Sequence, residues 1–216
     1  TTGVSLSTVG GTFSAPSGST ITNATGTDFF INGNSNSNAN VGITYGGTIT
    51  DDLGTLIQIQ NVTAASTHSF TGAITDNNDG DGSGISLTNN TGATITFSGG
   101  MTLSTGSNAA FSATSGGTVN VTGSTNTLTT STGTALNVQN TTIGASGLTF
   151  RSISSNGASS GIVLNNTGRG GLTVTGNTSG TCGGNVINSG STVTAPVSGD
   201  CSGGTILSST STGILL

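Results

Sequence analysis

Residues 84–103 have the sequence GISLTNNTGATITFSGGMTL, and this stretch decides the fold class. Apolar residues alternate with small polar residues in three short segments, at 85–87, 94–97 and 101–103. Alternation with a period of two, broken by Asn and Gly, is typical of short strands joined by turns. The stretch therefore predicts three consecutive strands, each with one apolar face.

The first of these segments recurs along the whole chain. Its copies are Val4-Ser5-Leu6, Phe29-Phe30-Ile31, Ile57-Gln58-Ile59, Ile85-Ser86-Leu87, Ala109-Ala110-Phe111, Leu136-Asn137-Val138, Ile162-Val163-Leu164 and Ile214-Leu215-Leu216. Their first residues are 25, 28, 28, 24, 27, 26 and 52 positions apart, so the last step is about twice the others. A flexible linker scatters its apolar residues, whereas a solenoid places them at a fixed period.

Two further alternating segments follow within each period. The second set contains Phe13, Ile43 with Tyr45, Phe70, Ile95 with Phe97, Val119 with Val121, Leu148 with Phe150, and Leu172 with Val174; the third contains Ile21, Ile49, Ile74, Met101 with Leu103, Leu128 and Ile153. Three strands in about 26 residues predict an all-β parallel β-helix of seven to eight coils in a single domain, residues 1–216. Parallel crossovers are overwhelmingly right-handed, so we expect a right-handed coil. A β-sandwich is the alternative fold, and a disordered chain is the third.

The composition excludes several classes of protein. The 216 residues include 44 Thr, 38 Gly, 32 Ser and 22 Asn, but only 7 acidic and 2 basic side chains. An ordinary globular domain has roughly a quarter charged residues, and two arginines cannot provide the cationic surface that nucleic acid requires. No apolar run approaches the roughly 20 residues of a membrane span. We therefore expect a protein that is not an ordinary cytosolic enzyme, that does not bind nucleic acid and that has no membrane span in this segment.

An Asn recurs two positions after the second inward residue of the first strand. An inward Asn at a corner can hydrogen-bond to its copy one coil away and form a ladder, whereas the simpler interpretation is that Asn favours turns. The predicted ladder is interrupted at Ala113 and consists of Asn61, Asn89, Asn140 and Asn166.

Thr-x-Thr motifs also recur, at 20–22, 48–50, 94–96, 127–129, 173–175 and 192–194. Regular hydroxyl and methyl arrays on a flat solenoid face are what ice-binding proteins use. The motifs fall on different predicted strands, since 94–96 belongs to the second strand and 48–50 to the third. This distribution argues against a single flat ice-binding face.

The densest acidic stretch, residues 76–84, partly matches an oxygen-rich calcium loop. Thr88 stands where that loop has its bidentate Glu. Asp51 and Asp76 both follow a third strand, so they should stack about one strand spacing apart and repel unless a cation intervenes. We expect no other cofactor, and the alternative is a solvated acidic turn. The predicted low-affinity Ca²⁺ ligands are Asp51, Asp76, Asp79 and Asp81.

Residues suited to catalysis are sparse and scattered. Glycoside cleavage on a β-helix needs paired carboxylates, or carboxylates with a basic residue, on adjacent coils. Arg151 and Arg169 lie about three coils from the acidic stretch, and His68 has no acidic partner one coil away. No Gly-x-Ser-x-Gly motif is present. We therefore expect a protein that is not an enzyme.

Cys182 and Cys201 lie inside the double-length step of the repeat. They predict an insertion at residues 177–204 whose base is pinned by a disulfide, which would place the chain in an oxidising compartment. The alternative is an irregular coil through Val186, Ile187 and Val193 with two free thiols.

Three stretches resemble the large bacterial β-strand-repeat proteins of the cell surface. They are residues 79–92, DGDGSGISLTNNTG, residues 128–138, LTTSTGTALNV, and residues 161–168, GIVLNNTG. The resemblance covers about residues 50–175. It implies a parallel β-helix within a long exported protein, often described as adhesin-like, and it carries over no catalytic residues.

These patterns lead to one functional expectation with three alternatives. We expect an extracellular structural or adhesive rod that is either a segment of a longer surface protein or a subunit that stacks end to end, because neither end shows an amphipathic cap. Its expected partners are copies of itself, a host surface or a glycan. The alternatives are an ice-binding solenoid, a Ca²⁺-dependent glycan-binding rod and a degraded polysaccharide lyase.

Overall fold

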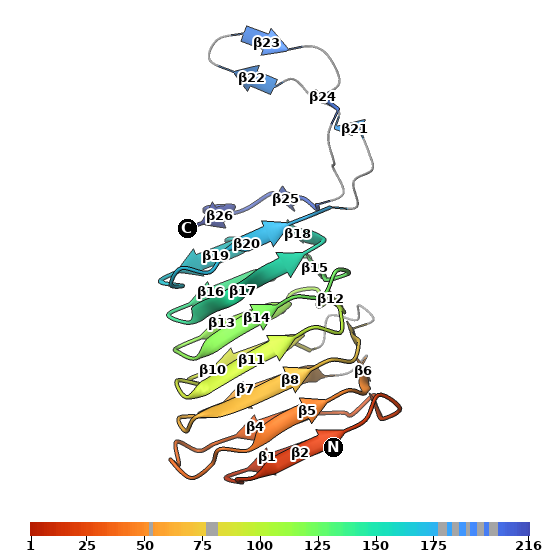
Figure 1. Ribbon diagram of the computed structural model, residues 1–216. Helices are drawn as coiled ribbons and strands as arrows, with labels where there is room; N and C mark the ends of the chain where they lie inside the picture. The colour runs from red at the N-terminus through yellow and green to blue at the C-terminus, as the bar shows by residue number, and fades with distance from the viewer. Residues whose placement is uncertain are drawn as a thin grey trace.

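The computed structural model describes residues 1–51, 54–76, 82–176 and 203–216, together with four short strands between 181 and 198. The side chains of Asp51 and of those four strands are not among the described parts. Every regular element in the described residues is a β-strand, and the chain rises from one end of a stack to the other (Figure 1). No helix of the described residues is long and apolar enough to cross a membrane.

The strands form three parallel sheets in which every third strand is a neighbour. The first, sheet A, contains β1 (Val4–Ser7), β4 (Thr27–Asn32), β7 (Thr55–Gln60), β10 (Ile85–Thr88), β13 (Phe111–Thr114), β16 (Leu136–Gln139), β19 (Ile162–Asn165) and β26 (Ile214–Leu215). Its register joins Ile57 to Ile85 and Ile85 to Phe111, so residues one turn apart stack directly.

Sheets B and C have seven strands each. Sheet B contains β2 (Thr12–Ala15), β5 (Gly42–Tyr45), β8 (Ser66–Phe70), β11 (Ala93–Phe97), β14 (Thr118–Val121), β17 (Thr142–Phe150) and β20 (Leu172–Val174). Sheet C contains β3 (Thr20–Thr22), β6 (Thr48–Asp51), β9 (Ile74–Asp76), β12 (Met101–Ser104), β15 (Thr127–Thr130), β18 (Ser152–Asn156) and β25 (Ile206–Leu207).

The element order A, B, C repeats without interruption through six turns of the described chain, from β1 to β18. A seventh turn begins with β19 and β20 and is completed by β25, and β26 begins the next turn on sheet A. The predicted parallel β-helix of three strands per coil is confirmed. The seven to eight coils predicted from the sequence correspond to about six regular turns plus one interrupted turn, because the double-length step interrupts the seventh.

Backbone hydrogen bonds fix the right-handed sense of the coil. When a strand of L-residues runs away from the viewer in the N- to C-terminal direction and a side chain points up, the N–H of that residue points to the right. The inward residue Ile57 donates its N–H to Gly84 O of the next turn at 3.2 Å, and Ile85 donates to Ala110 O at 2.9 Å. An inward side chain combined with an N–H that points to the following turn is possible only in a right-handed coil.

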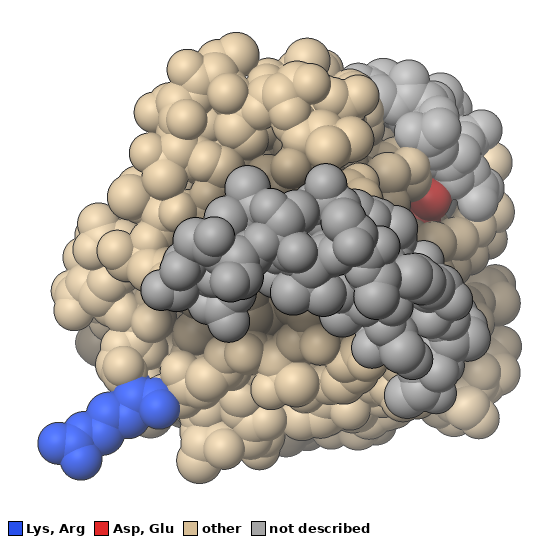
Figure 2. All heavy atoms as spheres, turned by 90° about the horizontal axis from the view of Figure 1, so that it is seen from above, with Lys and Arg blue, Asp and Glu red and all other residues tan. Residues whose placement is uncertain are grey.

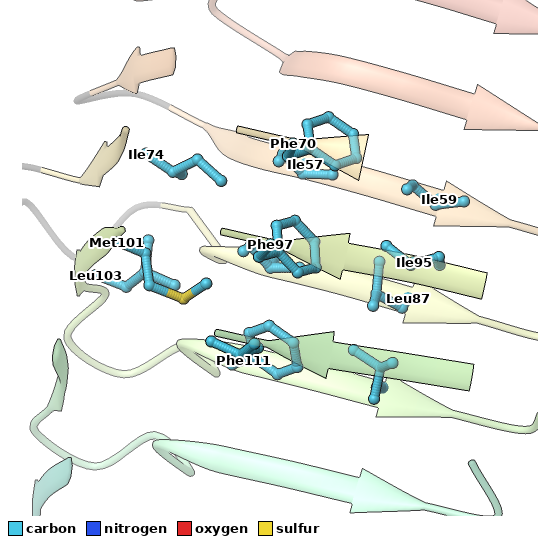
Figure 3. Packing of buried hydrophobic residues seen from close by; sticks show 14 of the residues in the cluster. Ile57, Ile59, Phe70, Ile74, Leu87, Ile95, Phe97, Met101, Leu103 and Phe111 are labelled. Atoms are coloured by element: carbon cyan, nitrogen blue, oxygen red, sulfur yellow. The ribbon is translucent and has the colours of Figure 1, made fainter. Parts of the chain in front are cut away.

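The core is a stack of inward side chains from all three sheets, and each turn adds one layer (Figure 3). A continuous row of aromatic rings runs through it. The Phe70 and Phe97 rings stack with centroids 5.3 Å apart, and Phe97 meets Phe111 of sheet A edge-on at 5.8 Å. Phe111 in turn contacts Phe150 at 6.1 Å. Edge and offset contacts of this kind stabilise beyond the area they bury.

The predicted phase of the repeat is wrong at one turn. The sequence pattern assigned Ala109 to the first inward position, whereas the residue paired with both Ile85 and Leu136 is Phe111. The alternation in 109–111 is compatible with either Ala109 or Phe111 as the first inward residue. Ala110 is also buried, although it lies at the turn before the strand. The spacing on either side of this turn is therefore more regular than the sequence pattern indicated.

Four short strands interrupt the seventh turn between β20 and β25. Strand β21 (Thr181–Cys182) pairs antiparallel with β24 (Val197–Ser198), and β22 (Val186–Asn188) pairs antiparallel with β23 (Ser191–Val193). Figure 1 shows them apart from the three sheets. The predicted disulfide between Cys182 and Cys201 lies outside the residues whose side chains are described.

Candidate binding groove on sheet B

Sheet B loses its regular register between β14 and β17. Thr118 pairs with Thr142 and Val119 with Ile143, but Val121 pairs with Leu148. The segment 144–147 is therefore accommodated opposite the single residue Asn120. Such a β-bulge pushes the extra residues out of the sheet plane, and Ala145 and Ser146 are exposed.

The following turn carries a matching outward segment. Ile143 donates its N–H to Thr167 O at 2.8 Å, and Leu148 donates its N–H to Gly171 O at 2.9 Å. Residues 168–170 thus lie beside the bulge without a ladder position of their own. A Cβ on Gly170 would lie 2.3 Å from Ile143 O, so only glycine allows this close approach of the two segments.

The two segments and β14 enclose a groove of about 680 Å³. Thr118 of β14, the run 142–145 of β17 and the run 169–171 line it. Arg169 is exposed at this groove and is one of only two cationic side chains in the sequence. Figure 2, viewed down the stack, shows one basic side chain standing away from the surface, and almost all other described residues in this view are neither basic nor acidic.

Asn120 lies directly beneath the bulge. Its side chain points outward from sheet B between the inward residues Val119 and Val121, yet it is only 7% exposed because the bulge covers it. A Cβ on Gly144 would lie 2.3 Å from Asn120 Oδ1. That carbonyl oxygen is buried without a hydrogen-bond partner, which is costly in a low-dielectric environment.

The groove offers hydrogen-bonding groups and one fixed positive charge. Thr118 and Thr142 supply hydroxyls, and the guanidinium of Arg169 supplies a planar donor suited to a carboxylate, sulfate or phosphate. None of the described lining residues is an Asp, Glu, His, Cys or Lys, so the groove can bind an anion but provides no acid–base pair.

The sequence contained a signal for this groove that the strand pattern did not use. Ile143 and Leu148 are five positions apart and flank two glycines, whereas their partners Val119 and Val121 are two apart. We predicted Leu148 and Phe150 as the inward pair of that turn and therefore missed Ile143, which is buried at 2% exposure.

His68 lies in the core and not in the groove. It stacks in the inward column between Ile43 and Ile95 and is fully buried. Its Nε2 lies 3.1 Å from Val41 O, and its Nδ1 has no hydrogen-bond partner. Burial lowers the pKa of His68 to about 4, against the smaller opposing effect of the bond to Val41. An inward, buried imidazole cannot contact a substrate.

The predicted Asn ladder exists in two pieces. Asn89 donates its side-chain N–H to Asn61 Oδ1 at 3.0 Å, and Asn166 donates to Asn140 Oδ1 at 3.0 Å. All four residues also have a positive φ of 49–58°, so the turn preference and the ladder act together. The side chains are half-buried or exposed, not inward as predicted.

The interruption of this ladder was assigned to the wrong residue. Ala113 pairs with Leu87 and points inward, so it does not occupy the ladder position. Ser115, with a φ of 64°, takes the left-handed turn position in that coil. Sequence reasoning also missed Asn90, which is 1% exposed, accepts the Val62 N–H at 3.2 Å and donates to Ile59 O at 2.8 Å.

The predicted calcium ligands are only partly described. Asp51 and Asp76 pair in register on β6 and β9, as their shared position after a third strand suggested. Asp79 and Asp81 lie outside the described residues. Within the described part of the chain, no three His, Cys, Asp or Glu side chains gather as a metal site would require.

Three of the six Thr-x-Thr motifs, at 20–22, 48–50 and 127–129, lie on sheet C and contribute to one outward column of hydroxyls there. Register pairs join the outward residues of six successive turns. These are Thr22, Thr50, Thr75, Thr102, Thr127 and Ser152. The motif at 94–96 lies on β11 of sheet B, and Thr173 and Val174 of the motif at 173–175 lie on β20 of the same sheet, so the predicted distribution of the motifs over different strands is confirmed.

No protein-family model matches this chain, and no curated protein or solved structure has a significant similarity to it. The fold is therefore established by the structure itself, and the resemblance to bacterial surface repeat proteins stays a prediction.

Proposed function

We propose that this chain is a structural and adhesive rod of an exported surface protein, and that it is not an enzyme. One observation carries the proposal: sheet A keeps a single register across eight strands around one continuous core. Because each turn contacts only its neighbours, such a stack gains length without a larger core. Length and stiffness are what a spacer on a surface requires.

The chemistry of the outer surface supports a location of the protein outside the cell. The outward positions of the sheets carry mostly Thr, Ser, Asn and Gln, as in Gln58, which donates its side-chain N–H to Gln60 Oε1 at 2.9 Å. The chain has only 2 basic residues, which leaves few sites for trypsin-like proteases. A compact ladder with few cleavable sites suits a proteolytic environment outside the cell.

The positions of His68 and of the groove residues support a role without catalysis. His68 is sealed in the core, and the groove has hydroxyls and a guanidinium but no proton donor and acceptor pair. General acid–base catalysis needs such a pair within reach of one substrate atom. We therefore assign the groove to binding.

Deletion of one complete turn tests the rod. Removal of residues 85–110 joins Gly84 to Phe111, and Phe111 already pairs with Ile85 at the same ladder position. We expect this variant to unfold cooperatively and to be shorter by about 4.8 Å in small-angle X-ray scattering. Removal of the half-turn 85–97 is the matched control and should not fold. A half-turn deletion as stable as the full-turn deletion would refute the stacked rod.

The proposal includes two ways in which such a rod reaches its full length, as a segment of a longer protein or as a subunit that stacks end to end. Electron microscopy of the pure protein distinguishes them, since long filaments would support end-to-end stacking and short monomeric rods would refute it.

A second candidate function is ice binding, and the hydroxyl column on sheet C favours it. Six stacked hydroxyls repeat at the strand spacing of about 4.8 Å, and five of them are on stiff β-branched Thr side chains. Thermal hysteresis of the pure protein tests this candidate, with Thr102→Val and Thr127→Val removing hydroxyls at constant shape. Absence of hysteresis eliminates it.

We also propose that Ca²⁺ binding at Asp51, Asp76, Asp79 and Asp81 supports adhesion. The support is the in-register backbone pairing of Asp51 with Asp76 on β6 and β9. We expect millimolar Ca²⁺ to raise the melting temperature and Asp76→Asn to abolish the response. An unchanged melting temperature in Ca²⁺ overturns this part of the proposal.

A further inference from the structure

We propose that the groove between the β17 bulge and residues 168–171 binds an acidic saccharide, with Arg169 holding its anionic group. This inference rests on the adhesive part of the proposed function and names a ligand class for it. The rod itself is tested separately by the turn deletion, so a failure of saccharide binding leaves the rod standing.

The charge distribution points to an anion. Arg169 is one of 2 basic residues in a chain whose formal net charge is −5, and no described groove-lining residue is acidic. The net negative charge of the chain repels an anion, whereas the guanidinium of Arg169 attracts it to the groove. A planar guanidinium binds carboxylates and phosphates through paired hydrogen bonds.

The surface that leads to the groove points to a ligand rich in hydroxyls. The outward residues Thr67, Thr94, Thr118 and Thr142 pair one after another on sheet B, and the last two line the groove. The row places one hydroxyl about every 4.8 Å along the stack. A sugar chain laid along this row can exchange hydrogen bonds at each turn, whereas a small inorganic anion can use only the groove.

The buried amide beneath the bulge is a second, independent feature of the site. Asn120 is 7% exposed, its Oδ1 lacks a hydrogen-bond partner, and it packs against Gly144 of the groove wall. A hydroxyl donor that enters beside Gly144 with a small shift of the bulge would satisfy this acceptor. The unpaired oxygen thus favours a ligand that brings donors as well as negative charge.

Calorimetry with defined oligosaccharides tests the proposal. The probes are an oligogalacturonate, the neutral oligogalactose of equal length, a sulfated oligosaccharide and inorganic phosphate. We expect the oligogalacturonate to bind and the neutral oligomer to bind at least tenfold more weakly. Equal binding of both oligomers would refute the role of the charge, and equal binding of phosphate would reduce the groove to a simple anion site and overturn the saccharide.

The chain provides matched control variants. Arg169→Ala should weaken oligogalacturonate binding at least tenfold, whereas Arg151→Ala removes the same charge from an exposed position outside the groove and should leave binding unchanged. Thr142→Val should weaken binding severalfold, and Thr94→Val, in the same column but outside the groove, should weaken it less. Equal losses from the two arginine variants, or no binding by the unaltered protein, overturn the proposal. Preference for the sulfated oligomer retains the acidic saccharide and identifies its charged group.

Discussion

Sheets A and B are built from the same repeat. Of these two sheets, only sheet A keeps a one-to-one register between neighbouring strands in every turn. On sheet B the inward column includes a histidine, and a bulge breaks the register between β14 and β17. Three buried polar atoms without hydrogen-bond partners lie on strands of sheet B, in Ser66, His68 and Asn120. Regular stacking provides stability, and the candidate binding site arises where that regularity is given up.

The largest expected effect is the loss of an aromatic side chain from the regular sheet. Phe111 of sheet A is fully buried between Phe97 and Phe150, so Phe111→Ala should destabilise the fold by about 3–5 kcal/mol. Phe30→Ala removes the same atoms from a half-buried outward position of sheet A and should cost about 1 kcal/mol or less. Denaturant unfolding measures both. Equal losses would mean that the inward column of sheet A does not dominate stability.

Acid should weaken the protein through His68 of sheet B. The pKa of the folded state is about 4, below the unperturbed 6.5, so between these values the unfolded chain binds more protons. Stability from the neutral imidazole is complete above pH 6.5 and is lost as the pH falls toward 4, by about 3 kcal/mol. The two residues paired with it are Ile43 and Ile95, which offer no compensating charge.

His68→Leu is the control for this pH dependence. All other titrating groups are the same in both proteins, so the difference between the two unfolding curves isolates the histidine. Parallel curves from pH 7 to 4 would show that the imidazole is not kept neutral by burial.

A smaller effect is expected at the bulge. Gly144→Ala brings a Cβ to within 2.3 Å of Asn120 Oδ1 and should destabilise by about 1–3 kcal/mol as the bulge shifts. Gly171→Ala is the matched control, because a Cβ there meets nothing within 4 Å although the residue lines the same groove. Thermal unfolding of the two variants compares them. If both are neutral, the bulge is loosely packed and Asn120 is not held by it.

The smallest effect is expected at the Asn ladder between sheets A and B. Asn89→Gly keeps the positive φ of 56° accessible but removes the hydrogen bond to Asn61, which should cost about 0.5–1.5 kcal/mol. Ser115→Gly alters the same turn position where the row of Asn is interrupted, and it should cost less. Identical melting temperatures of the two variants would reduce the ladder to a turn preference.

The regular part of the fold could be predicted because its information is local. Alternation in 85–87, 94–97 and 101–103 identifies strands, and the repeat of about 26 residues identifies stacking. The prediction failed where two registers fit the same pattern. Ala109 and Phe111 both satisfy the alternation, and only the packing of a large ring between neighbouring turns selects Phe111.

The candidate groove could not be predicted from the same pattern, because its parts come from different turns. Thr118, Ile143 and Arg169 meet only after the bulge has shifted the ladder between Val119 and Val121. The extra residues 144–147 are visible in the sequence as a longer interval with two glycines. Nothing in the interval itself shows which neighbouring residues it will cover.

The sequence by itself determined the period, the three strands per turn and almost all of the inward residues, since a core one layer thick requires an apolar residue at alternate positions of each strand. Only the tertiary structure decided which polar residues are buried and which hydroxyls share a face. Asn90 and His68 are sealed in, whereas Asn140 and Asn166 are exposed. Their environments depend on residues one turn away, and that distance is set by how the turns stack.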